Sequence, residues 1–420
     1  MSNWQKVNLD KLCFFEKGKT GLAKAIPGDY PLVTTSAERK TNDSYQFDTK
    51  AVCIPLVSST GHGHASLNYV HYQEGKFALG TILVALIPKD ETILNAQFLH
   101  LYLSRLKDMI LVPLMSGAAN VSLSISKIKT VEIPLPPIDE QLKIVELFKN
   151  LLNENNELVE EINTQQSLLK QLKQTILQEA IEGKLTAKYR AKNPDIGTAK
   201  ELLEQIKTEK EQLVKDKKIK ASKPLAPINE DEIPFDIPPT WEWYRLGDYS
   251  INRDGERKPI SQIERENRAK IYDYYGASGV IDKIDGYTHD GIFLLIGEDG
   301  ANLISRTTPI AFIANGKFWV NNHAHVLEFL NIVSLSYVEK YINAINLKPY
   351  VTGGFQPKLS QANLNNILIS IPPIEEQKEI VATIEKLFAI CDELEAEINQ
   401  NKTTVDNLMA TVLKEAFEQQ

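Results

Sequence analysis

The sequence lacks the features of a disulfide-stabilised or membrane-spanning protein. Its 420 residues include three cysteines, Cys13, Cys53 and Cys391, which is an odd number spread widely along the chain. A disulfide framework is therefore not expected, and a reducing cytoplasm fits this usage. No apolar run approaches the roughly 18 residues that a membrane-spanning helix needs, and no charged-then-apolar segment opens the chain. We expect neither a membrane span nor a secretory signal.

Catalytic motifs are also missing. Gly18-Lys19-Thr20 resembles the end of a phosphate-binding loop, but Cys13 stands where that motif requires glycine. The Asn-Pro-Pro-Tyr/Phe motif of adenine methylation does not occur, and neither a serine-centred elbow nor an obvious catalytic carboxylate pair is present. The sequence therefore predicts a recognition protein that has no catalytic residues and no cofactor of its own.

Two histidine pairs have the spacing of a metal-binding strand edge. His62 and His64 alternate along one segment, and His323 and His325 along another. A structural zinc site needs four ligands, and no matching cysteine or carboxylate cluster accompanies either pair. Hydrogen bonding is the favoured role for these histidines, and no metal site is predicted.

The net charge of −8 is unevenly distributed. Residues 136–185 and 372–420 carry net charges of −4 and −7, whereas residues 1–135 carry +3. Non-specific DNA binding depends on Lys and Arg releasing counterions from phosphates, so this chain should bind DNA non-specifically only weakly. The charge neither establishes nor excludes a nucleic-acid partner.

The chain contains a long internal repeat. Residues 136–182 return at 372–418 without a gap, with 19 identities in 47 positions. Pro136-Pro137-Ile138-Asp139-Glu140-Gln141 becomes Pro372-Pro373-Ile374-Glu375-Glu376-Gln377, an offset of 236. A period this long indicates a duplicated module rather than a solenoid.

Each repeat predicts a long helix that begins after the Pro-Pro pair, with acidic residues in its first turn where the helix dipole favours them. Apolar residues recur at heptad spacing over four to five heptads, which is typical of a coiled coil. We assign the a positions to Phe148, Asn155, Ile162, Leu169 and Ile176, and to Ile384, Cys391, Ile398, Val405 and Val412. The d positions are Ile144, Leu151, Leu158, Gln165 and Leu172, and Ile380, Leu387, Leu394, Asn401 and Leu408. We expect the helices 140–182 and 376–418 to form an intramolecular antiparallel coiled coil.

The segments outside the repeat are globular and mixed in structure. In the first, Ala51–Val57 and Lys76–Ile87 read as strands and Asn95–Ile110 as a helix. In the second, Ile292–Ile296 and Ile310–Ile313 read as strands and Ser334–Ile345 as a helix. Each segment is therefore predicted to be α+β.

Between the repeats lies a charged linker. Gly183 is a candidate helix C-cap, and Thr198 can cap a helix over 199–215. The predicted organisation is a first globular domain at 1–135, a helix at 136–185, the linker at 186–235, a second globular domain at 236–371 and a second helix at 372–420.

Two glycine-bearing polar loops are the candidate binding sites, residues 58–64 and residues 298–302. Arginine pairs with guanine and asparagine with adenine in a DNA major groove, so such residues near these loops are candidate base or phosphate contacts. The predicted DNA-binding residues are Ser58, Thr60, His62, His64, Lys76, Arg253, Arg257, Lys258, Tyr274, Glu298, Asn302, Arg306, Lys317 and Asn321.

Several segments together resemble the specificity subunits of type I restriction–modification systems. Ile133-Pro-Leu-Pro-Pro-Ile-Asp-Glu-Gln141 and Ile369-Ser-Ile-Pro-Pro-Ile-Glu-Glu-Gln377 resemble the beginnings of the two long helices in that family. So do Ile233-Pro-Phe-Asp-Ile-Pro-Pro-Thr-Trp-Glu-Trp243 and Gly353-Gly-Phe-Gln-Pro-Lys-Leu-Ser360. One departure is Gly117-Ala-Ala-Asn-Val-Ser-Leu-Ser124, which lacks the Gln-Pro of its counterpart.

The resemblance implies two target recognition domains, each reading one half of a bipartite site in double-stranded DNA. It further implies an antiparallel coiled coil that fixes their separation and docks two methyltransferase subunits, and restriction/translocase subunits that complete the enzyme. S-adenosylmethionine would be bound by the methyltransferases and not by this chain. The other possible reading of the residues is a coiled-coil structural adaptor whose globular ends bind proteins.

Overall fold

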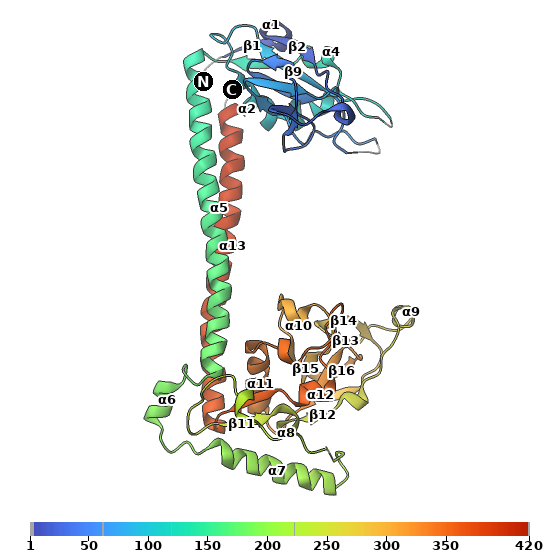
Figure 1. Cartoon of the computed structure of the whole chain (residues 1–420), viewed down its shortest axis with the longest axis vertical. Helices are drawn as coiled ribbons and strands as arrows, with labels where there is room; N and C mark the ends of the chain where they lie inside the picture. Colours follow the sequence, from blue (N-terminus) through green and yellow to red (C-terminus); the bar gives the residue numbers. More distant parts are fainter. Residues whose placement is uncertain (1–3, 61–62, 119, 222, 419–420) are drawn as a thin grey trace. The chain divides into compact units, whose positions relative to one another are not determined.

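The computed structural model describes residues 4–60, 63–118, 120–221 and 223–418. They form two compact units: unit 1 consists of residues 1–163 with 399–420, and unit 2 of residues 164–398. Two long helices, α5 (Ile138–Ile181) and α13 (Ile374–Glu418), contribute to both units (Figure 1). No helix among the described residues is long and apolar enough to cross a membrane.

Unit 1 contains a β-rich globular part. Its strands are β1 Gln5–Asn8, β2 Cys13–Lys17, β3 Tyr30–Val33, β4 Lys40–Asn42, β5 Phe47–Asp48, β6 Ala51–Pro55, β7 His71–Gln73, β8 Lys76–Leu79, β9 Leu83–Pro88 and β10 Glu132–Leu135. Its helical segments are α1 Leu9–Leu12, η1 Leu22–Lys24, α2 Ala96–Arg105, α3 Lys107–Ile110, η2 Val112–Leu114 and α4 Ile125–Lys129. Two four-stranded sheets have the orders β2-β9-β6-β7 and β4-β3-β8-β5, and β1 pairs with β10 in a separate two-stranded sheet.

The hydrophobic pattern explains why these segments pack as they do. All five residues of β6 are buried, and the strand lies between β9 and β7 in its sheet. The helix predicted over 95–110 is interrupted at Leu106, whose φ of −102° and ψ of 11° leave the helical region. The interruption redirects the chain, and Leu111 follows α3 as a fully buried member of the core. The expectation of one unbroken helix was therefore wrong.

Unit 2 contains the second globular part and the linker. Its strands are β11 Glu242–Arg245, β12 Ile251–Asn252, β13 Tyr272–Gly276, β14 Gly279–Ile284, β15 His289–Gly297, β16 Ala311–Val320, β17 Ala324–Glu328 and β18 Leu368–Ile371. Its shorter helical segments are α6 Ala187–Lys192, α7 Ala199–Lys215, η3 Glu230–Glu232, α8 Leu246–Tyr249, η4 Asp254–Glu256, α9 Gln262–Glu266, α10 Asn302–Ser305, α11 Ile332–Ala344, η5 Lys348–Tyr350 and α12 Gln361–Asn365. Six strands form one sheet in the order β12-β17-β15-β16-β13-β14, and β11 pairs with β18.

The two units repeat one plan. β1 and β10 pair antiparallel, with Gln5 opposite Leu135, and β11 and β18 pair in the same way, with Glu242 opposite Ile371. Each globular part is therefore a loop of chain whose two ends are joined in one small sheet. The mixed α+β class predicted from the sequence is confirmed in both.

Equivalent side chains lock each long helix to its own globular part. The Gln141 side-chain amide donates to the Pro136 carbonyl at 2.8 Å, and Gln377 does the same to Pro372 at 2.8 Å. Both glutamines are fully buried. Trp4 donates to Glu140 at 3.0 Å, and Trp241 donates to Glu376 at 2.9 Å. Since buried amides need partners, these bonds fix the direction in which each helix leaves its globular part.

The helices begin and end as the sequence indicates. Each starts directly after its Pro-Pro pair. After α5, Gly183 has a φ of +71°, and a Cβ there would lie 2.6 Å from Pro238 Cγ. Glycine is therefore required at this C-cap both for its left-handed backbone and for the close approach. Thr198 occupies the N-cap position of α7, but its side chain makes no capping bond, which departs from the prediction.

Within unit 2 the two long helices run antiparallel. Lys173 of α5 donates to Asp392 at 2.8 Å and to Glu395 at 2.9 Å. Thr186, just beyond the end of α5, donates to Glu376 at 2.7 Å, near the beginning of α13. Later residues of one segment thus meet earlier residues of the other, and the predicted antiparallel pairing is confirmed.

The heptad assignment is only partly correct. The a positions Phe148, Ile162, Leu169, Ile176, Ile384, Cys391 and Ile398 are all less than 10% exposed. Four of the ten d positions, Leu158, Leu172, Leu394 and Leu408, are instead 41–54% exposed, whereas the d residue Ile380 is fully buried. In α5 the second column toward the interior is e, with Leu152, Val159, Gln166 and Lys173 partly buried. Apolar residues stand side by side at d and e, as in Leu151-Leu152 and Leu158-Val159, so the helix can rotate by one position without losing apolar contacts.

Candidate nucleic-acid interface

The candidate loop of unit 1 follows strand β6 and is held by its own hydroxyl groups. The Ser58 hydroxyl donates to the His64 carbonyl at 2.6 Å, and the Thr60 and Ser66 hydroxyls are 3.0 Å apart. At its base, the Ser58 amide donates to the Val121 carbonyl at 3.0 Å. These short-range bonds join the described residues of the loop, among which Thr60 and His64 remain exposed. His62, also predicted to bind DNA, lies outside the described residues.

The loop of unit 2 occupies the corresponding place. In unit 2, Asp299 forms a β-bridge with Lys358. In unit 1, Val57 forms one with Ser122, the residue that aligns with Lys358 at the repeat offset of 236. In each unit the candidate loop is thus paired with a second turn, residues 116–122 in unit 1 and 352–358 in unit 2.

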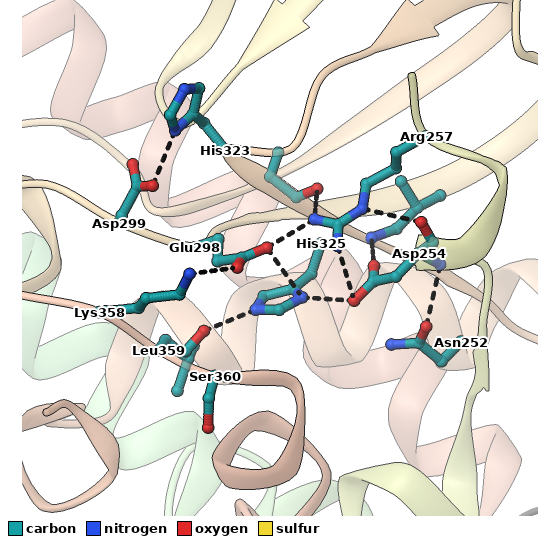
Figure 2. A network of polar contacts seen from close by, with 12 residues as sticks. Asn252, Asp254, Arg257, Glu298, Asp299, His323, His325, Lys358, Leu359 and Ser360 are labelled. Carbon is teal, nitrogen blue, oxygen red and sulfur yellow. Dashed lines mark hydrogen bonds and ion pairs between the residues drawn. The ribbon is translucent and has the colours of Figure 1, made fainter. Parts of the chain in front are cut away.

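A buried polar network lies beneath the unit 2 loop (Figure 2). His325 is fully buried, and its Nδ1 lies 2.7 Å from Asp254 Oδ2 while its Nε2 lies 2.7 Å from the Leu359 carbonyl oxygen. Arg257 donates to Glu298 at 2.6 Å and lies 3.5 Å from Asp254. The network joins η4, β17 and the loop, which are far apart in the sequence.

The network also shifts the protonation equilibria of its acids. Burial alone would raise the pKa of Asp254, but the hydrogen bond from His325 and the nearby charges of His325 and Arg257 outweigh it and hold that pKa below its usual value. Glu298 follows the same pattern. Burial raises its pKa, but the hydrogen bond from Arg257, the charge of His325 and the bond from Lys358 outweigh burial and hold the pKa below its usual value. Both groups are therefore carboxylates at neutral pH.

Replacing Asp254 with alanine should destabilise unit 2 by about 3–5 kcal/mol, because the buried His325 loses the carboxylate partner of its Nδ1 and Arg257 loses one of its two carboxylate partners. The loss should appear as a lower midpoint in chemical denaturation. Because the pKa of Asp254 is lowered in the folded state, its contribution to stability is present above the unfolded pKa of about 4 and is lost as the pH falls through the folded-state pKa. The difference in unfolding free energy between the wild type and Asp254→Ala should therefore disappear in acid. Asp290→Ala is the matched control, because Asp290 is 57% exposed and 4.0 Å from Lys317. Equal losses in the two variants would contradict a structural role for the network.

Five of the predicted DNA-binding residues have structural partners in unit 2. Arg257 and Glu298 bond each other. Tyr274 is 1% exposed, with its hydroxyl accepting the Ile260 amide at 3.1 Å. Arg306 donates to the Ile342 carbonyl at 3.0 Å, near the end of α11, and Asn321 is 4% exposed. Each of these five side chains is thus buried or bonded within the fold, and a contact of any of them with DNA stays a prediction.

The remaining predicted residues lie at or near the surface. Arg253 pairs with Glu328 at 2.6 Å, and Lys317 stands over the Tyr287 ring at 4.8 Å. Lys76 stands over the Tyr45 ring at 5.0 Å, and Lys258 is exposed. Asn302 binds the Thr308 backbone through both amide atoms at 3.1 Å. Lys76 belongs to unit 1 and the others to unit 2.

Sequence reasoning missed Asp254, Lys358 and the turn at 352–358. Asp254 is a single acid in a charged stretch, and nothing in the pattern pairs it with His325 across 71 positions. The His323/His325 pair was the feature of the sequence that could have pointed to this network. His323 Nδ1 lies 2.7 Å from Asp299 and His325 Nδ1 lies 2.7 Å from Asp254, so each histidine has its own carboxylate partner.

Comparison with known proteins identifies a family that matches most of this chain. The family model described as the type I restriction modification DNA specificity domain matches residues 1–166 and 238–401. The chain belongs to this family. The two matched regions coincide with the two repeats, each a globular part followed by most of a long helix.

Individual members of the family resemble parts of the chain. The specificity subunit of the type I restriction enzyme EcoEI from Escherichia coli is 29% identical over 269 residues, which is 57% of this chain and 44% of that protein. A putative type I restriction enzyme specificity subunit of Haemophilus influenzae, S.HindORF215P, is 36% identical over 153 residues, 36% of this chain and 38% of that protein. The matches therefore span less than half the length of either relative.

A solved structure supports the fold over the whole length. A chain from a study of complex assembly and conformational transition of the type I R-M system aligns with a TM-score of 0.65. The alignment covers 99% of this chain and 97% of that chain at 16% identity. At this identity the similarity concerns the fold alone, which is that of a family member with two globular parts and two long helices.

Proposed function

We propose that the chain is the sequence-specific DNA-recognition subunit of a type I restriction–modification complex and has no catalytic activity of its own. Residues 1–135 and 236–371 are the two target recognition domains, 136–185 and 372–420 the two coiled-coil helices, and 186–235 the linker. Each recognition domain reads one half of a bipartite site in double-stranded DNA, and the helices set the gap between the halves.

The observation that carries this proposal is the repetition of one plan. Two globular parts are each closed by an equivalent strand pair and fixed to an antiparallel helix by an equivalent buried glutamine. A protein with pseudo-twofold repetition suits a two-part site, because the half-sites of duplex DNA are themselves related in this way. Membership of a family described as a DNA specificity domain supports the same conclusion.

Exposure narrows the proposed DNA contacts. We retain the described residues outside the five discussed above, and propose that those five, which are buried or bonded within unit 2, support the fold around the loop. The retained residues are Ser58, Thr60, His64, Lys76, Arg253, Lys258, Asn302 and Lys317. Lysines at such positions bind phosphates without regard to sequence, whereas asparagine and arginine can read base edges.

The partners proposed are two methyltransferase subunits and the restriction/translocase subunits. The exposed d-position leucines support docking along the helices, since a helix pair that leaves Leu158 and Leu172 about half exposed offers apolar surface to further helices. The site of action proposed is the cytoplasm, because all three cysteines are free thiols buried in the fold.

Reconstitution with its methyltransferase tests the proposal. Sequencing of methylated bases in DNA from cells that carry the system should reveal one bipartite motif with a fixed gap. The purified complex should bind that motif about 10³-fold or more tightly than unrelated duplex DNA at physiological salt. A complex that binds DNA without sequence preference, while its globular parts bind other proteins, would support the structural adaptor instead.

A further inference from the structure

The turn at residues 352–358 presents an aromatic side chain that the fold does not use. Phe355 is fully exposed, although a phenylalanine ring is among the most costly apolar groups to leave in water. Its neighbours Gly353, Gly354 and Gln356 are exposed as well.

The turn is rigid at its base. Thr352 and Lys358 exchange two backbone hydrogen bonds, of 2.9 Å and 2.7 Å, which close the turn as a β-bridge. Gly353 has a φ of +88°, and a Cβ there would lie 2.5 Å from the Gln356 carbonyl oxygen. Only glycine fits this position, so the backbone conformation that presents Phe355 depends on Gly353.

The turn is bound to the candidate DNA loop. The Gly300 amide donates to the Pro357 carbonyl at 3.0 Å, and the Leu359 amide donates to the Glu298 carbonyl at 2.7 Å. Lys358 also pairs with Glu298 at 3.1 Å. The buried network of Figure 2 therefore supports the loop and the turn together, as its bonds to Lys358 and Leu359 show.

We propose that Phe355 is an aromatic wedge that stacks between neighbouring base pairs of the second half-site. This inference rests on the proposed function. Proteins that unstack DNA insert apolar side chains between base steps, and aromatic rings stack on any base because every base has a π-face. The exposed amide of Gln356 stands beside the ring and is suited to hydrogen bonding with a base edge.

The surroundings favour DNA over a protein partner. Aromatic anchors of protein interfaces lie in apolar pockets at the centre of the contact, whereas the surroundings of Phe355 are glycines and polar groups. The nearby acids have partners: Glu298 pairs with Arg257 and Lys358, and Asp299 bonds His323. A phosphate backbone can thus approach without meeting an unpaired carboxylate from these two residues.

The wedge is specific to the second half of the chain. At the repeat offset of 236, Ala119 aligns with Phe355 and Asn120 aligns with Gln356 in the sequence. Alanine has no ring to stack, so base unstacking by this device is expected at one half-site only. Ala119 itself lies outside the described residues.

The experiment uses the complex of the full chain with its methyltransferase and duplexes that carry 2-aminopurine, one position at a time, through both half-sites. The wild-type complex should raise the fluorescence at one step of the second half-site. Phe355→Ala should abolish that rise and weaken specific binding by about 5- to 150-fold. Phe355→Leu, which keeps an apolar wedge, should retain part of both effects.

Phe14→Ala is the matched control, because Phe14 is a 55% exposed phenylalanine in unit 1. It should leave the fluorescence at the second half-site unchanged. Unchanged binding and fluorescence in Phe355→Ala, with selective binding by the wild type, would overturn the wedge and leave the proposed function intact. Loss of the methyltransferase from Phe355→Ala without DNA would overturn it in favour of a protein contact. A wild-type complex without sequence preference would remove the proposed function and the wedge together.

Discussion

Exchanging residues 1–135 for the corresponding domain of a relative with another target should change one half of the recognised sequence and leave the other half unchanged. The structural reason is the closure of each globular part on itself. β1 and β10 place Gln5 opposite Leu135, so both exchange points lie in one small sheet beside the beginning of α5. The second globular part closes separately through β11 and β18. Neither reader depends on a strand from the other.

The result is measured by sequencing methylated bases and by binding to duplexes that carry each combination of half-sites. Binding to the original site should fall toward the non-specific level, by about 10³-fold or more, while the new composite site is bound selectively. The donor domain must supply a backbone N–H at the position of Asn95, which donates to the buried Gln141 side-chain oxygen at 2.8 Å, so proline is excluded there. The reciprocal exchange of residues 236–371 is the control and should change only the other half. A single exchange that altered both halves would contradict two independent readers.

Placing glutamate at Leu168 and Leu172 together should prevent the methyltransferase from docking while leaving the chain folded. These leucines are 57% and 45% exposed, and they stand one turn apart on one face of α5. Burial of each in an interface is worth about 1.5–3 kcal/mol, so the double variant should lose at least about 100-fold in affinity. Titration of the purified chain with the methyltransferase measures the change.

Lys170→Glu is the control for charge. It changes the charge of the same helix by the same two units. Lys170 is exposed, and because it precedes Leu172 by two residues it lies on roughly the opposite side of the helix. It should dock nearly as well as the wild type. A circular dichroism spectrum and melting curve of the Leu168→Glu/Leu172→Glu variant close to wild type would show that the helix pair persists. Normal docking by this variant would refute the proposal that the exposed leucines form the partner surface.

The sequence predicted the architecture because the architecture depends on signals that are local or repeated. The Pro-Pro pairs before α5 and α13 determine where the helices begin, and the apolar spacing of Phe98, Leu99 and Tyr102 marks α2. The heptad seam was harder to predict, because adjacent apolar residues such as Leu158-Val159 satisfy two registers and only tertiary contacts choose between them.

The candidate site was less predictable for a different physical reason. An arginine suited to a base edge is equally suited to a buried carboxylate, and Arg257 is used in the second way. Tyr274 likewise contributes a hydroxyl to the backbone of Ile260. Phe355 was overlooked because an isolated phenylalanine in a sequence carries no sign of exposure. Its significance depends on the Gly353 turn and on the bridge between Thr352 and Lys358, which only coordinates reveal.

The linker bonds in unit 2 have a consequence for chain continuity. Lys210 of α7 donates to the Asp248 and Ser250 carbonyls at 2.8 Å each, and Thr186 donates to the buried Glu376. Residues before 216 and residues after 228 are thus held to each other by contacts that do not run through the peptide chain between them. We expect a nick in that interval to leave two fragments that stay associated.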